Sequence, residues 1–340
     1  MEEMNKIEEY NYNLVKNDIE NIYKIFKDLL KEKDINTLIL GWFQYFILIC
    51  IEASNYVDIK NNFKYKKAIE NCRARMKPLE IEYEKIYYNM EELNYKKMNE
   101  FKSYVKRGVR EILKSIIPNY GVYKINNKII GNTFLYESIY KKIIYENGQI
   151  NTNKMVEVSK EIGSNISILI NVFDINRHYD GIDRNISIIN KDYNVFKCSN
   201  GLFKKCIDTN DGLILLNSIS IINFYTNIIC EMVTSKELKY RLGYIVYENT
   251  YNNILKSLEK IPNEKISKIM KKYECLKNEK FRNCMFHYSI LYDLNESELK
   301  EEMFLGIISK YLSINEETYI KLINKYMIEI AEILEKDILK

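Results

Sequence analysis

Apolar residues recur every three or four positions through most of the chain, which is the pattern of helices that bury one face. Only three prolines and eleven glycines are available to interrupt it. The pattern therefore predicts a mainly helical protein. The predicted helices are Glu3 to Leu30, Thr37 to Tyr56, a charged segment from Pro78 to near Pro118, Thr133 to Tyr145, Thr152 to Phe173, Asp211 to Val233, Lys236 to Leu258, Asn263 to Tyr292, Ser297 to Leu312 and Glu316 to Leu339.

Two regions depart from the helical pattern. Val122 to Ile130 places apolar residues on both sides of an Asn-Asn pair, which predicts a short β-hairpin. Turn-forming residues accumulate between Asp174 and Asn210, and a second hairpin at Asn194 to Cys206 is compatible with that stretch. We therefore expect the all-α class. The expected regions are a helical region over 1–175 with a regulatory or RNA-binding role, a connector over 176–209, and a helical bundle over 210–340. The short connections in the bundle favour antiparallel neighbours.

Two long apolar segments have the composition of membrane helices, but we expect both to be core helices. Leu38 to Ile51 is too short for a membrane span, which needs about 20 residues, and it contains Gln44. Leu213 to Val233 is interrupted by Asn217, Asn223, Thr226 and Asn227. The start of the chain is acidic where a secretion signal would be basic and then apolar. These observations predict a cytoplasmic location without membrane contact.

The net charge and the cysteine content exclude only a few classes of function. The net charge of +4 does not by itself identify a nucleic-acid binder. Seven cysteines without a Cys-x-x-Cys pair predict reduced thiols and no zinc site. Basic residues form two clusters, of which the first is typical of a solvated helix face and the second leads into Arg282. The first comprises Lys64, Lys66, Lys67, Arg73, Arg75 and Lys77, and the second Lys265, Lys268, Lys271, Lys272, Lys277 and Lys280.

The second cluster ends in the segment with the strongest chemical signal, residues 281–288. It places one of only two histidines, His287, five positions after Arg282, and Asn283 directly follows the arginine. Histidine moves protons near neutral pH, and arginine stabilises a phosphate that gains charge in a transition state. A helical projection separates a core face of Phe281, Cys284, Met285 and Tyr288 from an outer face of Arg282, Asn283, Phe286 and His287. Arg282 and His287 would then flank a groove, about 140° apart, unless the helix begins at Asn283.

This Arg-x4-His pattern, with Asn after the Arg, resembles the signature of HEPN-domain ribonucleases. The resemblance covers about the last 130 residues. It implies a HEPN-like bundle and a metal-independent endoribonuclease without cofactors, in which His287 is the general base or acid, Arg282 neutralises the phosphate and Asn283 orients it. Lys277, Lys280 and Phe286 are the expected substrate contacts. Many such proteins resemble toxins or antiviral effectors, so RNA, a second copy of the chain and an antitoxin or regulatory partner are the expected partners.

A homodimer also follows from the chemistry, because RNA cleavage needs two proton transfers and the motif contains a single histidine. An outward Phe286 would then lie at a twofold interface.

Other interpretations remain open. The motif could contact phosphate without catalysis, in a helical nucleotide-binding or protein-interaction module, or it could be an exposed helix face. The segment from Asp174 to Asp183 contains the other histidine, His178, and looks superficially like a calcium loop. Its glycine is displaced and no bidentate Glu follows, so we predict no metal and instead a capped helix end followed by a turn. Arg177 and His178 in that turn could also contact RNA or a regulatory ligand.

Overall fold

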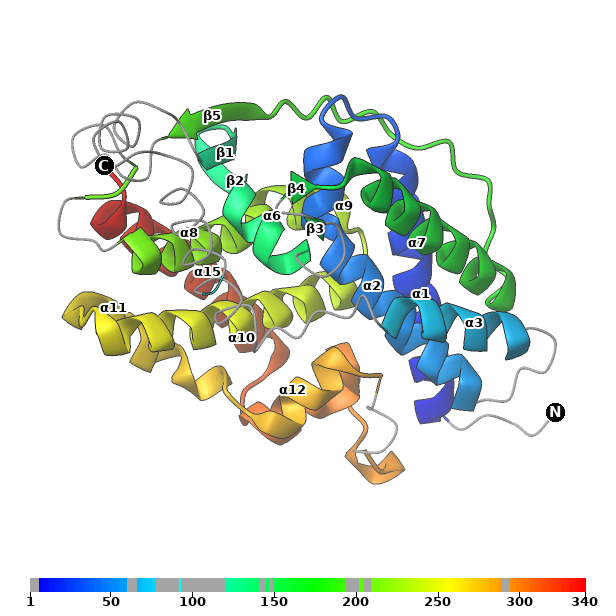
Figure 1. Ribbon diagram of the computed structural model, residues 1–340. Helices are drawn as coiled ribbons and strands as arrows, with labels where there is room; N and C mark the ends of the chain where they lie inside the picture. The colour runs from blue at the N-terminus through cyan, green and yellow to red at the C-terminus, as the bar shows by residue number, and fades with distance from the viewer. Residues whose placement is uncertain are drawn as a thin grey trace.

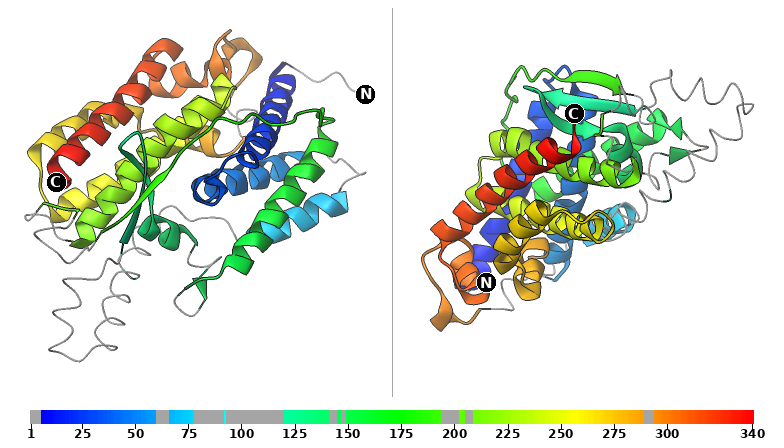
Figure 2. Two further views of the ribbon diagram at one scale, coloured as in Figure 1. Left: turned by 90° about the horizontal axis from the view of Figure 1, so that it is seen from above. Right: turned by 90° about the vertical axis from the view of Figure 1, so that its left-hand side faces the viewer.

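The protein is mainly helical, with a small three-stranded antiparallel sheet and a two-stranded ribbon among the described residues (Figure 1). A computed structural model describes residues 6–59, 66–77, 92, 120–140, 145–146, 149–193, 202–204, 209–288 and 294–340. The charged helix predicted after Pro78 lies outside these ranges, and so does most of the second hairpin predicted at Asn194 to Cys206. Two groups of helices lie side by side, one amino-terminal and one carboxy-terminal (Figure 2).

The amino-terminal group is built around the apolar helix α2. Helix α2 packs against α1, α3 and α7, and its aromatic side chains Trp42, Phe43 and Phe46 are fully buried. By length and composition, two helical stretches could cross a membrane, Ile35–Val57 and Asp211–Met232, but their apolar windows are 78% and 83% buried inside the protein. The prediction that both are core helices is therefore confirmed. The bounds in this group are α1 Lys6–Leu29, α2 Ile35–Ile59, α3 Lys66–Met76 and α7 Thr152–Val172.

A three-stranded antiparallel sheet of order β2-β1-β5 covers α8. The predicted hairpin is confirmed: β1 (Tyr120–Ile125) pairs with β2 (Lys128–Asn132), and both turn residues, Asn126 and Asn127, have positive φ as a tight hairpin of this twist requires. Strand β5 (Ile189–Tyr193) lies inside the predicted connector. Its side chains are mostly exposed, so it lacks the alternating apolar pattern that would have predicted it.

Between the hairpin and α7 the chain forms a short helix and a two-stranded ribbon. Helix α6 (Thr133–Tyr140) ends before the predicted Tyr145, which instead begins β3 (Tyr145–Glu146), paired with β4 (Gln149–Ile150).

The carboxy-terminal group contains α8, α10 and α15, which pack on one another, while α11 packs on α15 and α12 on α10. Helix α10 runs back alongside α8 after a short connection, as the predicted antiparallel arrangement requires (Figure 1). The bounds are α8 Thr209–Phe224, a π-helical turn Tyr225–Ile229, α9 Cys230–Met232, α10 Lys236–Lys260, α11 Glu264–Tyr273, α12 Glu279–Phe286, α14 Ile307–Leu312 and α15 Glu316–Ile338.

The two groups meet where Gly41 of α2 faces Phe224 of α8. A Cβ atom at position 41 would lie 2.3 Å from the Phe224 ring, so only glycine allows the helices to approach this closely. Trp42, the next residue of α2, contacts the same ring edge-on, with centroids 5.9 Å apart.

Three acidic side chains at the end of α1 and just after it fix the irregular segment over 182–188. Asp28 accepts the backbone N–H of Ile182, Glu32 accepts those of Arg184 and Ile186, and Asp34 accepts that of Ile188. The Arg184 guanidinium also pairs with Asp28. Carboxylates here satisfy backbone N–H groups that no strand in the described part of the chain pairs with.

Two predicted helices are wrong in extent. The segment predicted as one helix from Asn263 to Tyr292 is divided into α11, a 3-10 turn Glu274–Leu276 and α12. The division falls at Lys277 and Asn278, which are extended, although neither Pro nor Gly marks it. The segment predicted from Ser297 to Leu312 is helical only at 3-10 turns and α14, because Phe304 and Leu305 take positive φ.

Candidate active site

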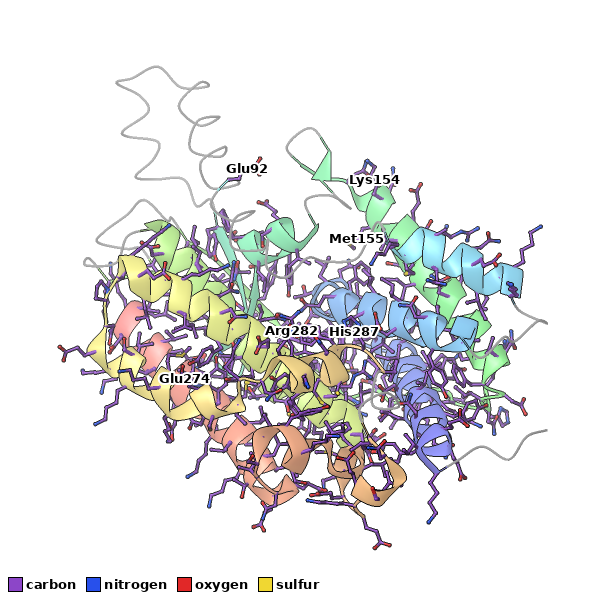
Figure 3. The ribbon with its side chains drawn as sticks, turned by 90° about the horizontal axis from the view of Figure 1, so that it is seen from below. Glu92, Lys154, Met155, Glu274, Arg282 and His287 are labelled. Atoms are coloured by element: carbon purple, nitrogen blue, oxygen red, sulfur yellow. The ribbon has the colours of Figure 1, made fainter. Side chains whose placement is uncertain are left out.

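The motif lies on α12 and at its carboxyl end. Helix α12 begins after Asn278, whose side chain accepts the backbone N–H of Phe281, so the helix start predicted as an alternative at Asn283 is wrong. The helix ends at Phe286, and His287 has extended backbone angles, φ −117° and ψ 150°. The predicted angle between Arg282 and His287 on a continuous helix therefore does not apply. Both residues lie at the junction of α12 with α10 and α2 (Figure 3).

Burial agrees with the predicted partition between core and outer residues, except that Phe286, predicted on the outer face, packs partly against the core. Phe281, Cys284, Met285 and Tyr288 are buried. Arg282, Asn283 and Phe286 are half-buried, and His287 is exposed. The helix thus holds its apolar stripe against α10 and presents the polar residues of the motif outward.

The His287 ring is held by a carboxylate from the other helical group. Its Nδ1 lies 3.0 Å from Oε2 of Glu52 in α2. The Glu52 side chain is only 7% exposed, whereas that of His287 is 53% exposed. An ionised carboxylate can only accept a hydrogen bond, so Nδ1 is the donor in this contact, and Nε2 is the atom that can act as a base whenever the ring is neutral.

A buried network fixes the backbone on both sides of His287. Arg241 of α10 donates from Nε to the Met285 carbonyl (2.7 Å) and forms a fully buried ion pair with Asp18 of α1. The Tyr288 hydroxyl donates to the same Asp18 carboxylate (2.8 Å), and the Tyr288 ring lies under the Arg241 guanidinium at 4.2 Å. Asn11 donates to the Tyr288 carbonyl (3.1 Å). Carbonyls at a helix end lack helical partners, and a buried cation satisfies one of them here.

Burial changes the acid-base properties of this network. It raises the pKa of Asp18 to about 6, although Arg241 and the Tyr288 hydroxyl act in the opposite direction. The same burial raises the pKa of Tyr288 well above its ordinary value. The buried ion pair with Arg241 favours the charged form of Asp18, and the Tyr288 hydroxyl keeps its proton, so Tyr288 is a donor in the core, in agreement with its assignment to the core face.

The remaining predicted site residues are placed as follows. The Arg282 guanidinium lies 5.9 Å from the centre of the Phe286 ring, an arrangement that orients the cation by its attraction to the aromatic face. Phe286 also packs against the core. Lys280 is exposed on the first turn of α12. Lys277 pairs with Glu248 and Asn252 of α10, so its ammonium group stabilises the junction before α12.

Sequence reasoning missed Glu52. One signal pointed to it, since Glu52 is the only charged residue between Ile35 and Val57, and a lone acid in a buried helix needs a partner. The partner could not be inferred, because it lies in a distant part of the chain.

The Asp174 to Asp183 segment follows α7 as a turn, with Arg177 donating to Asn171 and Tyr179 donating to Asp28. In the described ranges no group of three or more His, Cys, Asp or Glu side chains has the geometry of a metal site.

No family model, curated protein or solved structure matches this chain.

Proposed function

We propose that the protein is a metal-independent endoribonuclease that cleaves RNA through attack of the 2′-hydroxyl on the adjacent phosphate. The observation that carries the proposal is the exposed His287 ring, oriented by buried Glu52 beside an outward Arg282. A carboxylate on one ring nitrogen fixes the tautomer and makes the other nitrogen a better base. The resemblance to HEPN ribonucleases supports the same assignment.

Each residue has a definite role in this reaction. Nε2 of His287 removes the proton from the 2′-hydroxyl, the 2′-oxygen bonds to phosphorus, and the bond from phosphorus to the 5′-oxygen breaks. Arg282 balances the charge that grows on the phosphoryl oxygens, and Asn283 holds the phosphate in place. The products are a 2′,3′-cyclic phosphate and a 5′-hydroxyl. The chemistry requires no metal, because the nucleophile belongs to the substrate.

The departing 5′-oxygen must receive a proton from a second group. A homodimer around the outer face of α12 would supply it from the second copy of His287, and this is the assembly we propose. Light scattering tests it directly: a monomer that cleaves RNA at the full rate refutes the dimer while leaving the cleavage chemistry standing.

The decisive experiment is cleavage of end-labelled RNA in the presence of EDTA. We expect activity from the wild type and losses of at least about a hundredfold from His287→Ala and from Arg282→Ala, the usual range for a general base and for a charge-stabilising group. Lys321→Ala is the control, because it removes an exposed side chain of α15 that lies outside the motif. Equal activity in all variants, or cleavage abolished by EDTA, refutes the proposal.

RNA binding without cleavage would instead favour a non-catalytic nucleotide-binding module. The cellular role we propose, growth arrest or antiviral defence in the cytoplasm under control of an antitoxin or other regulatory partner, rests on the HEPN resemblance.

A further inference from the structure

A groove between α2 and α3 begins next to the candidate active site. It has a volume of about 410 Å³ and is lined by Ile51, Asn55, Glu70, Arg73, Ala74 and Lys77. Ile51 directly precedes Glu52, the residue that holds His287. Asn55 is three residues beyond Glu52, on the adjoining part of the same helix face and about 4.5 Å further along the axis. The groove and the His287 ring therefore share one stretch of α2.

The outer wall of the groove is basic. Between Lys66 and Lys77 the sequence contains five cations and one acid. Of these residues, Arg73 and Lys77 line the groove, one helical turn apart. Arg73 is half-buried and Lys77 is exposed, and both are part of the groove lining. Helix α3 (cyan) lies along α2 (blue), and His287, which follows α12, lies next to α2 in agreement with its contact to Glu52 (Figure 3).

We infer that this groove binds the stretch of the RNA strand next to the phosphate that is cleaved. Arg73 and Lys77 each contact a flanking phosphate, since cations spaced one turn apart on a helix suit a polyanionic strand. Asn55 and Glu70 supply the amide and the acceptor that can bond to a base edge or to a ribose 2′-hydroxyl. The volume lies within the range of about 300 to 1,000 Å³ typical of small-ligand pockets, which suits one nucleotide. The inference rests on the proposed function and names the part of the substrate that the amino-terminal helices hold.

The test measures binding separately from cleavage. A fluorescein-labelled single-stranded RNA carrying 2′-fluoro groups cannot be cleaved, and its affinity for the full-length protein is measured by anisotropy at several salt concentrations. We expect Arg73→Ala/Lys77→Ala to weaken binding about tenfold. The slope of log affinity against log salt should fall by about 1.4, because each lost contact to single-stranded nucleic acid contributes about 0.7.

The matched control is Lys321→Ala/Lys325→Ala. These exposed lysines have the same i,i+4 spacing on α15, in the other helical group, so the control changes net charge equally. Circular dichroism establishes that both double variants are folded. Affinity and slope that fall only in the groove variant support the inference, whereas equal changes in both variants, or no change in either, overturn it.

The outcomes also distinguish a failure of the groove proposal from a failure of the ribonuclease proposal. If the wild type does not cleave natural RNA but the groove variant still loses binding, the groove stands and the catalytic proposal fails. If the wild type cleaves RNA and the groove variant binds as tightly as the wild type, the catalytic proposal stands and the groove fails.

Discussion

Replacing Glu52 with Gln tests how the His287 ring is held. The substitution keeps the size of the side chain but removes its charge, so the contact of 3.0 Å at Nδ1 loses its charge assistance. Hydrogen bonds to charged groups contribute about 1.5 to 3 kcal/mol. If all of this free energy is lost from the transition state, the rate falls about 13- to 160-fold. Because the His287 side chain is 53% exposed and water competes for the ring, we expect the lower end, about tenfold.

The assay is single-turnover cleavage of labelled RNA with saturating enzyme, which isolates the chemical step. Thermal melting accompanies it, because the Glu52 charge is buried and its removal relieves a desolvation cost. We expect the rate to fall while the melting temperature stays the same or rises. The matched control is Glu335→Gln. Glu335 belongs to α15 in the carboxy-terminal group, and its carboxylate pairs with Lys128 of β2. An unchanged rate in Glu52→Gln, or the same loss in Glu335→Gln, refutes the reasoning.

Three further predictions concern the framework of the site. Asp18→Asn leaves the buried Arg241 without its counter-charge, so urea unfolding should show a loss of about 3 to 5 kcal/mol; a loss below about 1 kcal/mol, the value of an exposed pair, would contradict this. Gly41→Ala places a methyl group against the Phe224 ring and should cost about 1 to 3 kcal/mol, measured in the same way, and an unchanged stability would mean that α2 and α8 can separate without cost. Hydrogen bonds from Lys236 and from the Met303 backbone lower the pKa of Glu316 below 4.5. The stability that ionised Glu316 contributes is therefore present above pH 4.5 and is lost as the pH falls below that value. Between pH 6 and pH 3 the melting temperature should fall less steeply in Glu316→Gln than in the wild type. Identical slopes would count against the assignment.

Helix positions were predictable from the sequence wherever one continuous apolar stripe dominates. Helices α1, α2, α7, α10 and α15 agree with the predicted ranges to within a few residues, because their apolar residues decide both where the helix lies and which face it buries. The hairpin was predictable for a different reason, since the Asn-Asn pair tolerates the left-handed backbone that its turn requires.

Features set by tertiary contacts were not predictable. The break before α12 depends on Asn278, whose side chain caps that helix and also donates to the Tyr311 carbonyl. An Asn followed by Glu is a helix-start signal, but the surrounding apolar pattern continued through it. Strand β5 depends on pairing with β1, and the segment before it depends on carboxylates at the end of α1 and just after it, which the local sequence does not reveal.

In the candidate site, too, locally determined features were predictable and tertiary contacts were not. The outward placement of Arg282 and His287 followed from local periodicity, but the carboxylate on His287 did not, because it belongs to a helix near the other end of the chain. Whether the motif is catalytic and whether the chain divides near residues 176–209 remain predictions.

The Asp18–Arg241–Tyr288 network has a consequence for biosynthesis. Its members come from α1, from α10 and from the residues after α12, and a ribosome delivers the last of them only after residue 288 has been made. A nascent polypeptide that ends before residue 288 lacks a member of this network. If the protein is a ribonuclease, the messenger and ribosomal RNA around it are protected until translation has passed that residue.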